Sequence, residues 1–296
     1  MTRKELNYAE VYERIVTDLV DYVQKYNIKA LVLGISGGID STVCAAICNE
    51  VHERIGIKNV GISMPLKNQP DEVSTANLVG KAWYKGDNQK PDNNSYYNVI
   101  PISSVYNSFQ KLIWWNNPFS THLIYIDLPD QEGWSFEELN LHCENQNPLI
   151  NGNIMARTRM ILLYNIAGRE KGIVMDTDNL TEHWLGFFTI HGDQGDYKPI
   201  GQLWKMEVYG LAQWILENKA DTPEKKKSLE KSIALIPTDG NGVSKGDLEQ
   251  IGGESYDQVD RVLRNVINKE TNDLSDIPEE TQKRILARME GSWFKR

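Results

Sequence analysis

Cysteine is scarce in this chain, and so are the residue patterns that commonly bind a structural metal. The 296 residues include three cysteines, Cys44, Cys48 and Cys143, and none of them belongs to a CxxC pair. The five histidines show no HExxH spacing, so we expect no zinc site. The odd cysteine count predicts reduced thiols. The segment after Met1 lacks the apolar stretch of a secretory signal, which together with the thiols predicts a cytoplasmic protein.

Long apolar runs and a surplus of basic residues are also missing. No stretch approaches the roughly 18 consecutive apolar residues of a membrane span, so we expect no membrane partner. The chain carries 32 lysines and arginines against 41 aspartates and glutamates, a net charge of −9, so we expect no nucleic-acid partner. The Walker A pattern GxxxxGK[ST] is absent, which excludes that loop as a means of binding nucleotide phosphates.

A glycine turn between a predicted strand and a predicted helix is the most informative feature that is present. The apolar residues 30–33 indicate a buried parallel strand, and the helix after the turn begins near Asp40. The turn itself is Ser36-Gly37-Gly38-Ile39-Asp40-Ser41-Thr42. Backbone N–H groups converge at such a turn and the helix dipole favours negative charge, so the turn predicts a phosphate site. A carboxylate beside a phosphate makes chemical sense when a divalent cation lies between them.

Short apolar strands alternate with amphipathic helices through the first 175 residues. We expect strands at 30–33, 60–64, 99–102 and 172–175, with helices at 8–26, 40–47, 71–84, 105–115 and 153–169. Such alternation predicts an α/β fold with a parallel sheet covered by helices on both faces. In that architecture ligands bind beyond the carboxyl ends of the strands, where the glycine turn is expected to lie.

The remaining segments are predicted to be less regular. Residues 116–149 are rich in Asn and Pro turn signals, and we interpret them as an irregular insertion that forms a surface excursion, a lid or part of a dimer contact. Residues 205–296 are predicted to be a helical region, with helices at 205–218, 255–266 and 279–289. We expect polar linkers around residues 225–227 and 239–245. All of this is consistent with a single domain over residues 1–296.

A second group of motifs follows the glycine turn in a fixed order. These motifs are GNIMARTRM at 152–160, TDNLTEHWLGFFT at 177–189, HGDQGD at 191–196, KPIGQLWK at 198–205 and GGESYD at 252–257. Together with the turn, the set resembles the ammonia-dependent NAD synthetases of the PP-loop ATP pyrophosphatase family. That family has the patterns SGGxDS, GNxxARxRM, ExxxGxxT and NPIxxLxK. The resemblance covers about residues 8–115 and 150–290.

The resemblance implies a fold, an assembly and a reaction. The fold is a Rossmann-like doubly wound parallel sheet of the adenine nucleotide alpha hydrolase type, and the assembly is a homodimer. The reaction is amidation of deamido-NAD+ by ammonia and ATP, giving NAD+, AMP and pyrophosphate through an acyl-adenylate. The nicotinate carboxylate is a poor acyl donor until ATP converts it to that adenylate. The enzyme therefore contributes mainly positioning and charge stabilisation.

The resemblance also implies roles for individual residues. Asp40, Lys205 and Asp193 are the implied catalytic residues, and Asp40 and Glu182 are the implied ligands of Mg²⁺. The residues implied to bind ATP are Gly34, Ser36, Gly37, Gly38, Asp40, Ser41, Thr42, Arg159, Thr177, Lys205 and Thr238. The residues implied to bind deamido-NAD+ are Asn153, Arg157, Asp193, Asp196, Tyr256 and Asp257.

Two positions depart from the family pattern, and the short segment before the glycine turn bears on the source of ammonia. Asp176 stands where the family usually has glycine, so the local backbone or charge must differ. The spacing from Asp193 to Asp196 is one residue shorter than in the commonest bacterial pattern. About thirty residues precede the turn, too few for an amidase domain, and Thr2 places no cysteine nucleophile after Met1. We therefore expect the chain to use free ammonia or ammonia from another protein.

Two other kinds of function stay open at this point. Another PP-loop enzyme would adenylate a purine carbonyl or a tRNA base, although tRNA enzymes of this class usually carry basic surfaces or cysteine pairs. A nucleotide-binding protein on a catalytically decayed synthetase fold is the second alternative, suggested by Asp176 and the insertion at 116–149. Formation of NAD+ from ATP, ammonium and deamido-NAD+ distinguishes the three.

Overall fold

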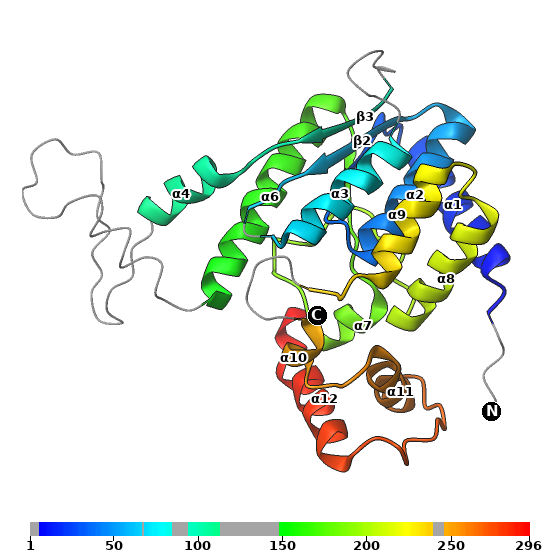
Figure 1. Ribbon diagram of the computed structural model, residues 1–296, viewed down its shortest axis with the longest axis vertical. Coiled ribbons are helices and arrows are strands. Elements are labelled where there is room, and N and C mark those ends of the chain that lie inside the picture. Colours follow the sequence, from blue (N-terminus) through cyan, green and yellow to red (C-terminus); the bar gives the residue numbers. More distant parts are fainter. Residues whose placement is uncertain (1–5, 67, 85–93, 113–147, 239–245) are drawn as a thin grey trace, which may run out of the picture.

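A parallel sheet forms the centre of the protein. The computed structural model describes residues 6–66, 68–84, 94–112, 148–238 and 246–296. Its strands are β1 (Ala30–Gly34), β2 (Lys58–Ser63), β3 (Ser95–Val99) and β4 (Ile173–Met175). In the described residues they form one four-stranded sheet in the order β3-β2-β1-β4, with every pair parallel (Figure 1). Among the described residues, no helix is long and apolar enough to cross a membrane.

Helices cover both faces of the sheet, as the sequence predicts. Because side chains alternate along a strand, Leu31 and Leu33 of β1 face one side while Val32 faces the other. The Leu31 face packs against α1 (Tyr8–Lys25), α2 (Ile39–Ile55), α3 (Pro70–Trp83), α8 (Lys205–Asn218) and α9 (Pro223–Ala234). The Val32 face packs against α6 (Pro148–Glu170), and α4 (Ser103–Leu112) also contacts α6 (Figure 1). The α/β fold with two covered faces is therefore confirmed.

A second apolar core lies among the helices that follow β4. It joins α7 (Leu180–Leu185), α10 (Asp247–Ile251), α11 (Tyr256–Ile267) and α12 (Glu279–Gly291), and a short 3-10 helix, η1 (Trp293–Lys295), follows α12. These helices gather at one end of the molecule (Figure 1). The predicted helices at 205–218, 255–266 and 279–289 correspond to α8, α11 and α12.

The order of the strands positions the site. From β1 the chain passes through α2 to β2 on one side, and it later returns to β4 on the other side of β1. The connections after β1 and β4 therefore diverge from two neighbouring strands, which opens a crevice at the carboxyl ends of both. The glycine turn follows β1, and residues 176–179 follow β4.

The third strand lies earlier than predicted. β3 covers Ser95–Val99, whereas the apolar pattern predicts 99–102. The ladder with β2 ends where Ile100 N donates to Ser63 O at 2.8 Å. The next residue, Pro101, has no N–H to continue the ladder. The apolar residues that suggested the strand instead include Ile102, which is fully buried in the core on the α6 side of the sheet.

The lysine-rich segment at 225–227 is a helix and not a linker. α9 begins at Pro223, and the Thr222 side chain caps it by accepting from Lys225 N at 3.2 Å. Its buried face is narrow, with Leu229 as its fully buried apolar residue, so the helical period is weak in the sequence. The ammonium of Lys225 lies 5.0 Å from the ring of Trp83 in α3. Residues 116–147, 239–245 and Cys143 lie outside the described residues, and the single-domain organisation stays a prediction.

Candidate active site

The glycine turn adopts a conformation that requires glycine. Gly37 has φ +88°, and a Cβ at this position would lie 2.6 Å from Ala76 N and 2.9 Å from Glu72 O in α3. A side chain is therefore excluded by both the backbone conformation and the packing. Gly38, the N-cap of α2, carries no side chain that accepts from the amides of the first turn. Such a helix start leaves its N–H groups to an external anion.

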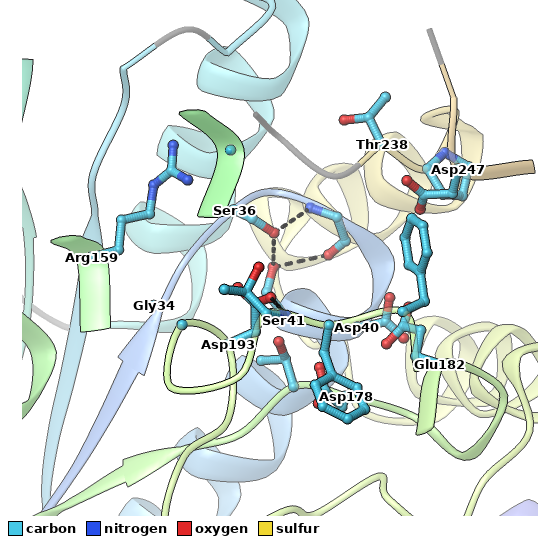
Figure 2. A pocket seen from close by; sticks show the side chains of 18 of the residues that line it. Gly34, Ser36, Asp40, Ser41, Arg159, Asp178, Glu182, Asp193, Thr238 and Asp247 are labelled. Carbon is cyan, nitrogen blue, oxygen red and sulfur yellow. Dashed lines mark hydrogen bonds between the residues drawn. The ribbon is translucent and has the colours of Figure 1, made fainter. Parts of the chain in front are cut away.

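Hydroxyl groups line the turn. Ser36 Oγ lies 3.0 Å from Ser41 Oγ and accepts a hydrogen bond from Gly38 N, while Ser41 Oγ donates to Gly38 O (Figure 2). Thr42 is fully buried and, unlike Ser36 and Ser41, does not line the pocket. Its Oγ1 lies 2.9 Å from Gly38 O and 2.7 Å from the Ser232 hydroxyl of α9. Thr42 therefore fastens the turn to α9 and does not face the pocket.

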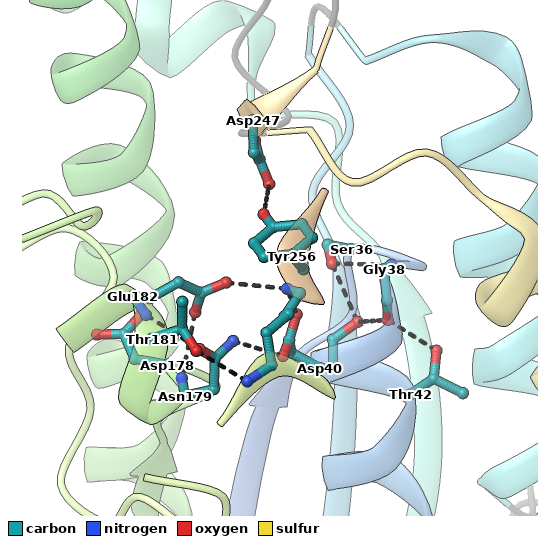
Figure 3. A network of polar contacts seen from close by, with 12 residues as sticks. Ser36, Gly38, Asp40, Thr42, Asp178, Asn179, Thr181, Glu182, Asp247 and Tyr256 are labelled. Carbon is teal, nitrogen blue, oxygen red and sulfur yellow. Dashed lines mark hydrogen bonds and ion pairs between the residues drawn. The ribbon is translucent and has the colours of Figure 1, made fainter. Parts of the chain in front are cut away.

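One lysine lies between the two acids that were predicted to hold a metal. The ammonium of Lys205, the first residue of α8, lies 2.5 Å from Asp40 Oδ2 and 3.0 Å from Glu182 Oε1 (Figure 3). Lys205 is 1% exposed. Burial lowers its pKa, but the charges of Asp40 and Glu182 outweigh burial and raise the pKa well above its ordinary value. Burial also raises the pKa of Glu182, to about 7, although Lys205 opposes this shift.

Asn179 holds both acids in place. Its Nδ2 donates to Asp40 Oδ1 at 2.9 Å. The same residue is the N-cap of α7: its Oδ1 accepts from Glu182 N at 3.0 Å, and its N–H donates to Glu182 Oε2 at 3.2 Å. This is a capping box, in which the N-cap side chain and the N3 carboxylate satisfy each other's backbone. Glu182 thus caps its helix with one oxygen and binds Lys205 with the other.

A buried acid behind Lys205 joins the starts of α7 and α8. Asp260 of α11 accepts from Thr181 Oγ1 at 2.6 Å and from Met206 N at 2.8 Å. Thr181 in turn accepts from Lys205 N at 2.8 Å. Burial raises the pKa of Asp260 to about 6. The centroid of the Tyr256 ring lies 5.1 Å from the Lys205 ammonium, and Tyr256 itself does not line the pocket.

Asp176, the residue that stands in the glycine position, is the centre of a second ion cluster. It is almost fully buried, and its carboxylate accepts from Asp178 N at 2.8 Å and from Gly195 N at 3.0 Å. Lys198 Nζ lies 3.3 Å from Asp176 Oδ2 and 3.2 Å from Asp178 Oδ2. Burial raises the pKa of both acids, and Lys198 opposes the shift. The extra charge of Asp176 is therefore compensated within the structure by Lys198.

The loop after α7 is hydrogen-bonded to α6, where both segments line the pocket. Asp193 Oδ2 accepts from Thr189 N at 2.7 Å, and the Thr189 hydroxyl donates to Asn153 Oδ1 at 2.8 Å. Arg157 Nε donates to Ile190 O at 3.1 Å. Burial raises the pKa of Asp193. Asn153 and Arg157, both on α6, therefore hold the segment that carries Asp193.

Arg159 and Thr238 lie near α3. Arg159 Nε donates to Met64 O at 3.2 Å and its Nη2 donates to Asn68 Oδ1 at 3.3 Å. The Thr238 hydroxyl donates to the carboxylate of Glu72. Both residues line the same pocket as the glycine turn (Figure 2).

Most of the predicted site residues line one pocket of about 600 Å³ in the described part of the chain. Those that line it are Gly34, Ser36, Gly38, Asp40, Ser41, Asn153, Arg157, Arg159, Thr177, Glu182, Asp193, Lys205 and Thr238. Five others do not: Gly37, Thr42, Asp196, Tyr256 and Asp257.

Two of these five residues lie on the surface. Asp196 accepts from Val174 N at 2.8 Å and from the Tyr164 hydroxyl at 3.1 Å, so it fastens its loop to the middle residue of β4 and to α6. Asp257 is 55% exposed at its side chain and forms an ion pair with Arg261 one helical turn later. The structure gives neither residue a place in the pocket.

Several pocket residues were not predicted. Asp178, which lines the pocket, and Asn179, which holds Asp40, lie inside the TDNLTE motif, so the sequence did contain a signal for them. Arg288 and Lys295 also line the pocket, but they lie in no recognised motif. Only packing of α12 and η1 against α7 brings them there.

The sheet order, the glycine turn at its switch point and the facing acids define an α/β protein of the PP-loop class. A family model described as NAD synthase matches residues 11–83 and 117–296. The chain belongs to the NAD synthase family. The matched ranges include most of residues 116–149, which we interpreted as an insertion.

Individual relatives agree with the family model. The chain is 30% identical over 282 residues to an NH3-dependent NAD+ synthetase of Pyrobaculum aerophilum, covering 94% of this chain and 83% of the relative. It is 28% identical over 303 residues to one of Trichlorobacter lovleyi, covering 100% and 91%.

Solved structures share the fold. The structure of NMN synthetase from Francisella tularensis matches with a TM-score of 0.71 at 22% identity, covering 99% of this chain and 97% of the other. The NH3-dependent NAD synthetase from Campylobacter jejuni matches with a TM-score of 0.66 at 21% identity, covering 98% and 96%.

Proposed function

We propose that this protein is a carbon–nitrogen ligase that amidates deamido-NAD+ with ammonia at the expense of ATP, releasing NAD+, AMP and pyrophosphate. Membership of the NAD synthase family supports this proposal. The observation that carries it is the contact of Lys205 with Asp40 and Glu182 beside the glycine turn. In this proposal the phosphates of ATP lie beside that cation and the two acids.

The chemistry proceeds in two substitutions. A carboxylate oxygen of deamido-NAD+ attacks the α-phosphorus of ATP, the bond to the bridging oxygen breaks, and pyrophosphate leaves. Ammonia then attacks the acyl carbon of the adenylate, loses a proton, and expels AMP. Neither step requires a covalent enzyme intermediate, so positioning and stabilisation of charge supply the catalysis.

The glycine turn is the proposed binding site of the ATP phosphates. The amides at the start of α2 and the hydroxyls of Ser36 and Ser41 are the donors on this wall. Lys205 adds a point charge that follows the negative charge developing on pyrophosphate. Arg159, Thr177 and Thr238 line the same pocket and are proposed contacts to the rest of ATP.

The net negative charge of the acid pair fits a divalent cation. Asp40 and Glu182 share one ammonium, which leaves an excess negative charge in the site, and burial together with the charge of Asp40 raises the pKa of Glu182. Among the described residues, no group of three or more acids, histidines or cysteines is placed to hold a metal alone. Mg²⁺ commonly takes one or two carboxylates plus substrate phosphates. Asp40 and Glu182 would thus hold Mg²⁺, which would neutralise charge on the phosphates when bound.

The acceptor is assigned to the other wall of the pocket. Asn153, Arg157 and Asp193 line it, and hydrogen bonds connect all three through the segment 189–193. We infer roles for them in binding deamido-NAD+, as the family resemblance implies. Asp196, Tyr256 and Asp257 lie outside the pocket lining, so in this proposal they act only through the residues they hold.

We also infer that two copies of the chain associate through α6. Leu149, Ile150, Ile161 and Tyr164 of this helix are all more than 40% exposed. Large apolar side chains concentrated on one helix are typical of a protein–protein contact. The same helix carries Asn153 and Arg157, so association through α6 would place the acceptor wall near the partner.

The direct test is product formation by the purified chain. With ATP, Mg²⁺, ammonium and deamido-NAD+, we expect NAD+, AMP and pyrophosphate in equal amounts, measured by chromatography and an enzymatic NAD+ assay. Glutamine in place of ammonium should give no NAD+. Nicotinate mononucleotide offers the same carboxylate and tests the choice of acceptor. AMP release on another acceptor without NAD+ would support a different PP-loop enzyme, and absence of ATP cleavage would support a non-enzymatic nucleotide-binding protein.

A further inference from the structure

Helix α9 carries two buried serines. Ser228 and Ser232 lie one helical turn apart and are 0% and 1% exposed. The helix packs against α2 and α3, the two helices that flank the glycine turn (Figure 1). Neither serine lies in a recognised motif, and neither lines the pocket of the glycine turn. Because a buried hydroxyl needs a hydrogen-bond partner, the partners show what each serine holds in place.

Ser232 is hydrogen-bonded to the glycine turn itself. Its hydroxyl donates to Gly37 O at 3.0 Å and lies 2.7 Å from Thr42 Oγ1. Thr42 Oγ1 donates to Gly38 O at 2.9 Å (Figure 3), and Ser41 Oγ donates to the same oxygen at 3.0 Å. Hydroxyl groups therefore hold both carbonyl oxygens of the Gly-Gly pair.

The direction of each carbonyl sets the direction of the amide that follows it. A trans peptide group is planar, so its C=O and N–H point in opposite directions. Because Ser232 holds Gly37 O, the N–H of Gly38 points away from α9, and it donates to Ser36 Oγ at 3.2 Å. Since Gly38 O is held on the side of the helix, the N–H of Ile39 points out of the helix start, where Gly38 and Ile39 line the pocket.

The peptide between Gly37 and Gly38 has an alternative orientation. Rotation about ψ of Gly37 and φ of Gly38 turns this peptide over, and glycine accepts the backbone angles that result. The turned peptide would present Gly37 O to the phosphates in place of an N–H. A carbonyl oxygen and the phosphate oxygens repel each other, so this orientation would weaken phosphate binding. The hydrogen bond from Ser232 opposes the rotation.

We propose that Ser232 is a positioning residue for phosphate binding, because it keeps the Gly37–Gly38 peptide in the orientation that directs N–H groups at the phosphates. The inference rests on the proposed function, in which the glycine turn binds the phosphates of ATP. Ser232 acts through the turn and does not touch the nucleotide. Thr42 shares this task through its contacts with the Ser232 hydroxyl and Gly38 O.

Ser232→Ala tests this assignment, with Ser228→Ala as the matched control. Ser228 is buried on the same helix, but its hydroxyl donates to Lys225 O at 2.7 Å and accepts from Trp83 Nε1 at 3.0 Å. Each variant loses one buried hydroxyl, so both should lower the thermal midpoint by a similar amount. Ser232→Ala should raise the KM for ATP about five- to twentyfold, whereas Ser228→Ala should leave it within about twofold.

The kinetic pattern separates positioning from general damage. Saturating ATP draws the turn back into the binding orientation, so the kcat of Ser232→Ala should fall by less than about threefold. A variant that only unfolds more readily loses kcat and keeps its KM. Thr42→Val should also raise the KM for ATP, and adding it to Ser232→Ala should raise the KM by less than the product of the two single effects. An unchanged KM for ATP in Ser232→Ala, or an equal rise in both alanine variants, would overturn the proposal.

Binding of magnesium pyrophosphate tests the same role without the reaction. In calorimetry, wild type and Ser228→Ala should bind it equally well, and Ser232→Ala should bind it about five- to twentyfold more weakly. If the wild type makes no NAD+ but binds pyrophosphate in this pattern, the proposed function fails and the role of Ser232 stands. Equal affinities in wild type and Ser232→Ala, or no binding by the wild type, would show that Ser232 does not position a phosphate site.

Discussion

Lys205 and Asp40 are 165 residues apart in the chain, yet the lysine ammonium lies 2.5 Å from the aspartate carboxylate. Lys205 is the first residue of α8, where the helix dipole disfavours a positive charge, and it is almost completely buried. The carboxylates of Asp40 and Glu182 offset both costs. The position of this lysine therefore depends on three segments: α2, α7 and the start of α8.

Replacing Asp40 should stop the chemistry and leave the fold intact. Asp40→Asn removes one charge from the site that is proposed to hold Mg²⁺, so we expect pyrophosphate release to fall at least about a hundredfold. The thermal midpoint should change by only a few degrees. Asp71→Asn is the control, because Asp71 lies in the first turn of α3 and is exposed. Near-normal turnover in Asp40→Asn would contradict the metal role.

Removing Lys205 should destabilise the protein through the acids it leaves behind. Lys205→Met places Asp40 and Glu182 side by side without a cation, and we expect a loss of about 3 kcal/mol in the free energy of unfolding. Glu182→Gln in the same chain should recover at least about 1 kcal/mol, because one of the two repelling charges is gone. Urea denaturation of the two single variants and of the double variant measures this coupling. Additive effects would show that the lysine and glutamate do not interact.

The Asp176–Lys198 pair should behave as a unit. Lys198→Met leaves two adjacent buried carboxylates without a cation, and we expect a loss of about 2–4 kcal/mol of stability. Asp176→Asn combined with Lys198→Met should lose less than the sum of the two single effects. Lys226→Met, at an exposed position of α9, is the matched control. If the double variant loses as much stability as the two single variants together, Lys198 does not compensate for the charge of Asp176.

Asp260 should make stability depend on pH in a predictable direction. Its pKa is about 6 in the folded protein against an ordinary value of 3.8, so the folded state holds the proton more tightly. The stabilisation is complete below pH 3.8 and is lost as the pH rises through 6. When the pH falls from about 7 to about 5, the free energy of unfolding of the wild type should rise by about 1 kcal/mol relative to that of Asp260→Asn. Urea titrations at both pH values measure this, and a constant difference would contradict the assignment.

The exposed face of α6 should control association. Ile161, 56% exposed, should tolerate aspartate in the isolated chain but not within an apolar contact between two copies. Sedimentation should give a dimer for wild type and a monomer for Ile161→Asp at micromolar concentration. Val266→Asp, at a position of α11 that is 50% exposed, should leave the dimer unchanged. A wild-type monomer would contradict association through α6.

Local sequence patterns predicted much of the fold and part of the site. The glycine turn, the parallel strands β1 and β4, and most helices follow from apolar period, caps and breakers, which are local properties of the chain. The third strand was misplaced because Ile100 and Ile102 are apolar although both lie beyond the end of β3 at Val99. Helix α9 was missed because three consecutive lysines mask a narrow apolar face.

The order of the motifs and the chemical types of their residues can be read from the amino-acid sequence, because turn chemistry and helix starts are encoded over a few residues. Which of those residues meet depends on how the whole chain packs. Packing leaves five predicted residues outside the pocket lining and pairs Asp176 with Lys198; the five are Gly37, Thr42, Asp196, Tyr256 and Asp257. It also brought Arg288 and Lys295 to a wall shared with Arg157. Such contacts join residues that are not neighbours in the sequence, and they arise from packing of whole elements, which no local pattern records.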